Sequence, residues 1–236
     1  MEIVITDLTR FSNPEKVCIA GINATTRECI RPLPYMSYKK CKELDILPGS
    51  KLRDNFTQNN NRGIPHIEDS YYQEKDLNHI GQCTSNEFYQ VLNSSLFNSI
   101  SQGFGYPFPE GGKVIPYTNP PQHSIITLKV SASQIKVVKD SYNEGKIKLN
   151  FRDNDGKKYY YLPITDLGFY NYAMNHFNDD DFPSSLNSFL GSQDELYLRI
   201  GLSGRYKSPD GKDDYWLQVN GIYTFPDYDT EIRSYN

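Results

Sequence analysis

The sequence predicts a mainly β protein of the α+β class, built from two small β-barrels that each carry a packed helix. Two observations support this class. Aromatic residues make up 14% of the 236 residues, including 19 Tyr and 12 Phe, and aromatic side chains favour strands. Short segments of alternating polarity also recur between turns that are rich in Gly, Pro and Asn. A chain of this length can hold one large β-domain or two small domains.

The first block of the chain is expected to contain strands followed by one helix. The strand segments are 3–6, 16–22, 26–31 and 50–53, with strand-like residues again around 66–72 and 77–81. The helix, near 84–98, begins with a capping box, because Thr84 is followed three residues later by Glu87. Its apolar positions form one stripe at helical spacing: Phe88, Val91, Leu92 and Leu96. This stripe should pack the helix against the first sheet.

The boundary between the two domains is expected in a segment rich in Gly and Pro. Residues 102–122 contain four Gly and five Pro among 21 residues. Segments of this length without secondary structure are usually linkers or functional loops. We therefore expect an N-terminal domain over 1–110 and a C-terminal domain over 111–236.

The second block repeats the rough order of the first, with short strands, then helices, then a final hairpin. Its strand segments are 124–130, 133–139, 146–151, 157–162, 195–201 and 215–225. Helices are expected near 166–177, with Asp166 as N-cap, and near 183–190. Several short strands with a helix inserted before the closing strand match the small OB-type barrel. Two OB-like barrels would account for the length of the chain.

The final hairpin carries the strongest candidate for a binding surface. Strand alternation places five side chains on one outward face: Tyr197, Arg199, Trp216, Gln218 and Asn220. A symmetric register sets Arg199 opposite Gln218 and Tyr197 opposite Asn220. Arg205 in the connecting loop could extend the face or belong to a solvated tip. The rings offer stacking area, the guanidinium offers a fork of donors, and each carboxamide carries a donor and an acceptor. The alternative is that this face packs against a helix or against the first domain.

Three arginines of the first block form a smaller candidate site. Arg27 and Arg31 lie on one face of a predicted strand, and Arg10 follows the opening strand. Guanidinium groups gathered at one edge could bind phosphate. A solvated charge ladder on the surface is the alternative, and the sequence leaves both open.

Composition limits the other functions of the chain. The net charge is −4, but nine basic against five acidic groups give +4 over residues 101–165, and five against twelve give −7 over 166–236. Any contact with nucleic acid is therefore expected to be local. The four Cys and four His lack the spacing of metal ligands, so we expect no metal and no cofactor. No apolar run reaches the ~20 residues that cross a bilayer, and no secretion signal is recognisable, so we expect no membrane contact and a cytoplasmic location.

Two segments resemble a known family. They are the opening ITDLTRFSNPEKVCIAGINATTRECIRP and the closing LYLRIGLSGRYK with YWLQVNGIYTFPDY, which are similar to the ends of a little-characterised bacterial family described as a dual OB-containing domain. Because these motifs bracket the chain, the resemblance covers nearly all of it. It implies two OB-like units, binding of nucleic acid or a nucleotide, and a link of some members to prokaryotic defence against phage. It supplies no catalytic residues.

Three functional hypotheses follow. The favoured one is a non-catalytic recognition module that binds single-stranded or modified nucleic acid, or a nucleotide. The alternative is a protein-interaction subunit of a defence or DNA-processing complex that uses the aromatic face as its interface. The third is a nucleotide-processing enzyme, because Ile5–Leu8 is echoed by Ile164–Leu167 and would supply two carboxylates, Asp7 and Asp166. Known catalytic motifs are absent from the sequence, and such an Asp more often caps a helix or turn, so an enzyme is less expected.

Overall fold

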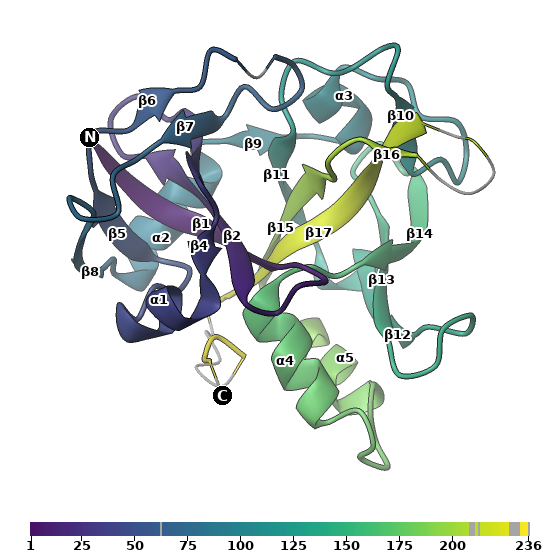
Figure 1. Ribbon diagram of the computed structural model, residues 1–236. Coiled ribbons are helices and arrows are strands. Elements are labelled where there is room, and N and C mark those ends of the chain that lie inside the picture. The colour runs from purple at the N-terminus through teal and green to yellow at the C-terminus, as the bar shows by residue number, and fades with distance from the viewer. Residues whose placement is uncertain (62, 208–210, 212, 227–231, 236) are drawn as a thin grey trace.

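The strands of the described residues form three open sheets (Figure 1). The computed structural model describes residues 1–236 except 62, 208–210, 212, 227–231 and 236. Strands make up 40% and helices 18%, so the fold is mainly β, as the sequence predicts. No sheet closes on itself within the described ranges. Residues 1–94 are called the N-terminal half below, and residues 95–236 the C-terminal half.

The N-terminal half contains a sheet in the order β6-β7-β3-β2-β1-β5-β8, with β4 paired to β2. Its strands are β1 (Glu2–Arg10), β2 (Lys16–Asn23), β3 (Cys29–Leu33), β4 (Met36–Ser37), β5 (Ser50–Arg53), β6 (Thr57–Gln58), β7 (Asp69–Tyr71) and β8 (Asn78–Gln82). β1, β2 and β3 are antiparallel neighbours, β5 pairs with the other edge of β1, and β7 runs parallel to β3. β1 is buried on both faces, because the core of this half covers one face and the C-terminal half covers the other.

The C-terminal half contains two sheets, in the orders β10-β17-β15-β11-β9, with β16 paired to β17, and β12-β13-β14. Their strands are β9 (Leu96–Phe97), β10 (Val114–Pro116), β11 (Ile125–Val130), β12 (Ile135–Lys139), β13 (Ile147–Arg152), β14 (Lys158–Pro163), β15 (Glu195–Leu202), β16 (Tyr206–Lys207) and β17 (Asp213–Phe225). Only the 3₁₀ turn η1 (Ala132–Gln134) separates β11 from β12, so one kinked segment links the sheets. A parallel bridge between Ile164 and Val219 links β14 to β17. The two sheets therefore enclose a common core.

Five helices complete the described part of the chain. They are α1 (Tyr38–Glu43), α2 (Ser85–Asn93), α3 (Ile100–Phe104), α4 (Leu167–Asn175) and α5 (Ser184–Gly191). The capping box predicted for α2 is present, with reciprocal hydrogen bonds between Thr84 and Glu87. Asp166 caps α4, as predicted, by accepting from Phe169 N at 3.2 Å. None of the described helices has both the length and the apolar character needed to span a bilayer.

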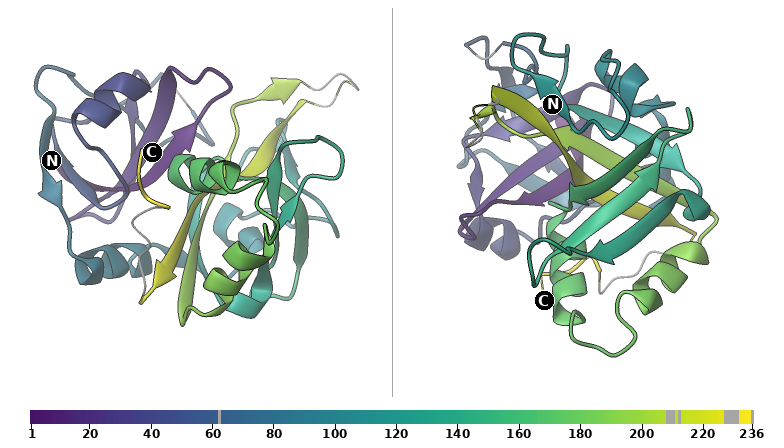
Figure 2. Two further views of the ribbon diagram at one scale, coloured as in Figure 1. Left: turned by 90° about the horizontal axis from the view of Figure 1, so that it is seen from below. Right: turned by 90° about the vertical axis from the view of Figure 1, so that its right-hand side faces the viewer.

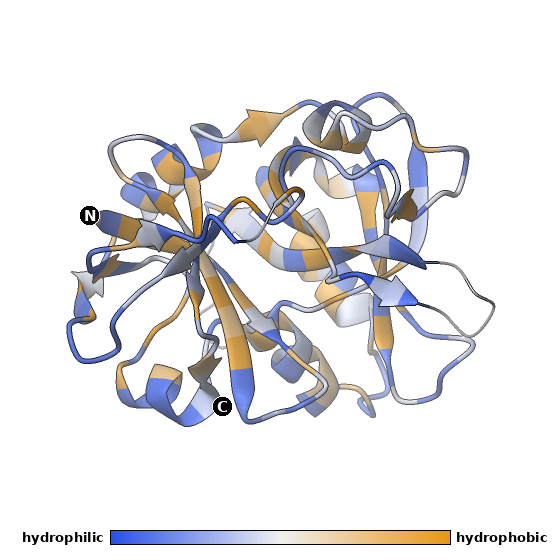
Figure 3. Cartoon of the chain, turned by 45° about the horizontal axis from the view of Figure 1, so that its top comes forward, coloured by the Kyte–Doolittle hydropathy of each residue, from blue (hydrophilic) through white to orange (hydrophobic). Residues whose placement is uncertain are grey.

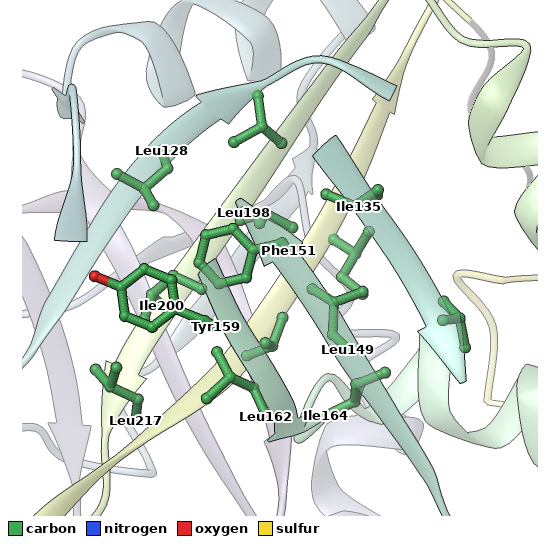
Figure 4. Close-up of a cluster of buried hydrophobic side chains, with 14 of the residues drawn as sticks. Leu128, Ile135, Leu149, Phe151, Tyr159, Leu162, Ile164, Leu198, Ile200 and Leu217 are labelled. Carbon is green, nitrogen blue, oxygen red and sulfur yellow. The ribbon is translucent and has the colours of Figure 1, made fainter. Parts of the chain in front are cut away.

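Each half has its own hydrophobic core. In the C-terminal half, residues of both sheets meet between them, including Leu149 and Phe151 from β13 and Leu198 and Ile200 from β15 (Figure 4). The core of the N-terminal half is smaller and includes Leu167, which comes from α4. Hydrophobic and hydrophilic residues alternate along strands of both halves (Figure 3), as expected where one face of a strand points inward.

The change from one core to the other lies before the predicted domain boundary. Ile100, Phe104 and Phe108 belong to the C-terminal core, and β9 pairs with β11. A Cβ atom added at Gly103 would lie 2.5 Å from Ile126, so α3 rests directly on β11. These contacts favour a boundary near residue 95, and the division at residue 110 stays a prediction.

The two halves pack closely through β1, β17 and α2 (Figure 2). A cluster of buried residues joins them: Val4, Ile22, Phe88, Val91, Leu92, Tyr197, Tyr223 and Phe225. Backbone bonds also cross the interface, because Arg10 N donates to Thr165 O at 2.9 Å. The buried carboxylate of Glu68 accepts from Ser124 N at 2.6 Å and from Ile125 N at 3.2 Å. The interface is therefore specified by polar as well as apolar contacts.

Candidate functional site

The final hairpin forms as predicted, but in a different register. The observed pairs between β15 and β17 are Arg199 with Gly221 and Tyr197 with Tyr223. The predicted pairing with Gln218 and Asn220 is therefore wrong. One reason is a β-bulge at Asn220, which the ladder skips. The other is that β17 begins at Asp213 and pairs there with β10 and β16, so the connection between the two strands is not a symmetric turn.

Tyr197 and Arg199 face the N-terminal half instead of solvent. Their exposed fractions are 0% and 1%, so the prediction that they lie on an open surface is wrong. Arg199 donates to Asp7 Oδ2 from Nε at 2.9 Å and from Nη2 at 2.7 Å, and to Thr127 Oγ1 at 2.7 Å. Tyr197 Oη donates to Asn93 Oδ1 at 3.1 Å. Strand alternation identifies side chains that share a face, but it does not reveal what covers that face.

A groove of about 660 Å³ lies between the two halves, beside this buried ion pair. Its walls come from β1, β2 and β3 on one side and from β15, β17 and their connection on the other. Six of the nine residues predicted for the site line it: Arg10, Arg31, Arg205, Trp216, Gln218 and Asn220. Arg27 lines a separate hollow of about 390 Å³ together with Arg199, and Tyr197 lines neither space. The groove thus joins parts of the two candidate sites that the sequence suggested separately.

Four aromatic rings line the groove: Phe11, Tyr35, Tyr206 and Trp216. The rings of Phe11 and Tyr35 lie 4.7 Å apart between centroids. Sequence reasoning missed these two residues, because they lie in loops after β1 and β3 that only the fold brings together. The position of Phe11 next to Arg10 was the available signal. Trp216 is half-buried, and its Nε1 has no hydrogen-bond partner among the residues that the structure describes.

The three arginines of the groove differ in how far their charge is already paired. Arg31 is buried and donates from Nε to Asp69 Oδ1 at 2.5 Å. Arg205 is exposed and donates from Nε at 2.7 Å and from Nη2 at 2.5 Å to the carboxylate of Asp213. Arg10 is half-buried and forms no ion pair within the described ranges. Arg10 is therefore the groove cation most available to a phosphate.

The floor of the groove is polar, and only some of its hydrogen-bonding groups have partners. Asn220 Oδ1 accepts from Gln218 Nε2 at 3.1 Å and from Thr165 Oγ1 at 3.0 Å. Asp7 uses Oδ2 for the arginine of β15, whereas its Oδ1 has no hydrogen-bond partner in the described part of the chain. The groove lining thus includes one unpaired acceptor, Asp7 Oδ1, and one unpaired donor, Trp216 Nε1. Both atoms are buried in the folded chain, and unpaired buried groups of this kind are costly.

The Cys18 thiol, which lines the groove, and the Asp166 carboxylate have the surroundings of residues with a structural role. Burial raises the pKa of the Cys18 thiol to about 11, so it is neutral at pH 7. Asp166 lies outside the groove and accepts from the backbone N of Phe169 and of Ile222 at 3.2 and 3.0 Å. Burial raises the pKa of its carboxyl to about 6. Among the described residues, no cluster of His, Cys, Asp and Glu is suited to hold a metal ion.

The comparison with protein families agrees with the two-part architecture. A family model described as a dual OB-containing domain matches residues 1–222. The match covers the N-terminal half and the C-terminal half up to residue 222, and it includes all six predicted residues that line the groove. No curated protein and no solved structure matches the chain.

Proposed function

The chain belongs to the dual OB-containing domain family, and on this premise we propose that it is a non-catalytic module that binds single-stranded or modified nucleic acid, or a nucleotide, in the groove between its halves. OB-containing domains generally bind nucleic acids or proteins. The observation that carries the proposal is the convergence of Trp216, Arg10 and the half-buried carboxamide of Gln218 on one groove. These are the groups that stack on a base, neutralise a phosphate and hydrogen-bond to a base edge.

The proposed binding mode divides these tasks between the two halves. Trp216 supplies a stacking surface, which contributes about 1–3 kcal/mol per base. Gln218 lines the groove with a half-buried side chain, and its carboxamide would hydrogen-bond to the base edge. Arg10, from the N-terminal half, supplies the charge for the phosphate. With a net charge of −4 for the whole chain, affinity depends on this local arrangement and not on a general basic surface.

We also propose that each half is an OB-like unit. In both halves, three antiparallel strands precede a helix, and the end of the third strand lies parallel to a later strand. This parallel contact is between β3 and β7 in the N-terminal half, and between Ile164 and Val219 in the C-terminal half. The groove lies where the two units meet.

The single Trp of the chain makes the test direct. Because Trp216 is the only Trp, its fluorescence reports on the groove alone. We expect single-stranded oligonucleotides to quench this fluorescence in a saturable way at low salt. The affinity should fall as salt rises, with a slope of about −0.7 in log–log form for each phosphate contact. Absence of binding across DNA and RNA oligonucleotides at low salt would overturn the proposal.

Two substitutions give the matched comparison, read by the anisotropy of a labelled oligonucleotide. Trp216→Ala removes the stacking surface and should weaken binding by roughly 5- to 150-fold, the equivalent of about 1–3 kcal/mol. Tyr142→Ala removes an aromatic side chain that is 83% exposed and lies outside the groove. It should leave the affinity unchanged.

A protein partner is the second candidate, and one observation favours it. Tyr206 and Tyr117 are 53% and 41% exposed, and the Arg205 guanidinium lies 3.4 Å from the ring centroid of Tyr117. Tyr and Arg are enriched at protein interfaces. Three results together would favour this function. A protein partner co-purifies with the chain after nuclease treatment, the Tyr206→Ala variant loses that partner, and oligonucleotides do not bind the chain.

A further inference from the structure

A second hollow continues the groove, and it is called the outer pocket here. It measures about 810 Å³, and Arg10, Phe11 and Ser12 line both spaces. The other walls of the outer pocket come from the start of β2, the N-terminal end of α1, and α4. The two spaces therefore lie on either side of the loop that follows β1.

Cations dominate the lining of the outer pocket, although the whole chain is acidic. Among the described residues, Arg10, Lys16 and Lys39 line it against one acidic residue, Glu15. Lys16 is exposed and forms no ion pair with any described residue. Lys39 and Glu43 are 3.8 Å apart with both side chains more than half exposed, and such a pair contributes little. The positive charge of the pocket is thus available to attract an anion.

Aromatic rings accompany these cations. Phe11, Tyr38 and Tyr170 line the outer pocket, and all three are half-buried, so part of each side chain remains accessible. The Arg10 guanidinium carbon lies 3.8 Å from the ring centroid of Tyr170, while the Arg10 backbone N donates to Thr165 O at 2.9 Å. These contacts fix a cation at the junction of the two spaces. Aromatic rings interleaved with basic groups are typical of surfaces that follow a single strand.

We propose that the outer pocket binds the nucleotide that flanks the one in the groove, so that the site takes a strand of two or more nucleotides with Arg10 on the phosphate between them. This inference rests on the proposed function of the groove. Each space falls within the roughly 300–1,000 Å³ of ordinary ligand sites, which is enough for one nucleotide. A guanidinium can keep its face on an aromatic ring while its edge donates to a phosphate.

The test compares thymidine monophosphate with a hexathymidylate strand on the unmodified chain. We expect the strand to bind at least tenfold more tightly, because it fills both spaces and contacts more phosphates. Its log affinity should fall more steeply with log salt, by about 0.7 for each added phosphate contact. The fluorescence of Trp216 reports binding of both probes, because both occupy the groove.

Paired lysine variants test the outer pocket itself. Lys16→Ala combined with Lys39→Ala should lower the salt slope for the hexamer by up to about 1.4, at about 0.7 for each lost contact. Binding of the monophosphate should not change. The matched control is Lys42→Ala combined with Lys75→Ala, because both lysines are exposed and lie outside the two spaces. This control pair removes the same charge and should leave the hexamer affinity near that of the unmodified chain.

Each other outcome has a definite meaning. Equal affinities and salt slopes for the two probes would overturn the proposal for the outer pocket and leave the proposal for the groove intact. An equal loss in the control pair also overturns it, because the effect then comes from net charge alone. Failure of both probes to bind overturns the outer pocket and the proposed function together.

Discussion

The two halves of the molecule differ in how much of its hydrophobic core each half supplies for itself. The C-terminal core fills the space between two sheets and receives residues from α3, α4 and α5. The N-terminal core is smaller, and it includes Leu167 from α4 and packs against Tyr235 from near the C-terminus. The N-terminal half thus takes part of its interior from its neighbour.

Buried polar groups also join the two halves. Asp7 and Glu68 of the N-terminal half are paired with Arg199 and Ser124 of the C-terminal half. Asp166 of the C-terminal half accepts instead from backbone groups of its own half. Because the N-terminal core also depends on Leu167 and Tyr235, weakening the interface should destabilise the N-terminal half more than the C-terminal half. A hydrophobic core in each half therefore does not make the two halves equally independent.

Replacing Arg199 by Leu should have the largest effect, because it leaves the Asp7 carboxylate buried without its cation. Removing one partner of a buried ion pair typically costs about 3–5 kcal/mol. We expect the free energy of unfolding in urea to fall by this amount, and hydrogen exchange to rise more in β1 and β2 than in β13. Asp7→Leu combined with Arg199→Leu should recover much of the loss, because no buried charge remains. A single-variant loss below about 1 kcal/mol, the range of surface pairs, would contradict this view of the interface.

Truncating one phenylalanine in each core tests the asymmetry directly. Phe56 and Phe151 are 5% and 3% exposed and lie in the N-terminal and C-terminal cores. Replacing either by Ala should cost about 3–5 kcal/mol at most. We expect Phe151→Ala to raise hydrogen exchange in both halves, and Phe56→Ala to raise it mainly in the N-terminal half. The opposite pattern would mean that the N-terminal half supports its neighbour.

Local signals in the sequence predicted the helices better than the long-range arrangement. The caps of α2 and α4 are set by residues within one turn, so Thr84, Glu87 and Asp166 identify them. The short helix α1, capped by Ser37, has no apolar stripe long enough to predict. Leu96 leaves the predicted helix and lies in β9, because α2 ends at Asn93.

The candidate site was predictable in composition but not in position. Side-chain alternation placed Trp216 and Gln218 correctly on one face of β17 with Arg199. It could not show that β1 covers that face at Arg199 and leaves a groove at Trp216, because this depends on packing between distant segments. The register failed at Asn220 for a related reason, since a bulge has no clear signal in a single sequence. Arg10 and Trp216 are separated by about two hundred residues, and only the interface brings them to one groove.

The stability of the folded chain should depend on pH through Asp166, a buried residue of the C-terminal half. Burial raises the pKa of its carboxyl from 3.8 to about 6 in the folded chain. The folded state therefore binds this proton more tightly than the unfolded state does. The contribution of Asp166 to the free energy of unfolding is complete below pH 3.8 and is lost as the pH rises through 6. The change amounts to about 3 kcal/mol at most, at 1.36 kcal/mol per pKa unit. Urea unfolding from pH 4 to 7 should show this loss in the unmodified chain.

The Asp166→Asn variant isolates this effect. It keeps one acceptor oxygen for the cap of α4 but cannot ionise. The difference in unfolding free energy between the two chains should shift in favour of the variant as the pH rises from 4 to 7. A difference that does not vary with pH would show that the carboxyl titrates near its ordinary value.

The smallest expected effect distinguishes the contributions of the two halves to the groove. Arg10→Gln and Arg205→Gln remove the same charge, one from each half. Asp213 already neutralises Arg205 through two hydrogen bonds, whereas Arg10 forms no ion pair within the described residues. Arg10→Gln should therefore weaken oligonucleotide binding by roughly threefold at moderate salt and reduce the salt slope by about 0.7, the value for one phosphate contact. Arg205→Gln should leave the slope unchanged. If the two variants behave alike, the groove responds to net charge, and the N-terminal half has no specific part in binding the phosphate.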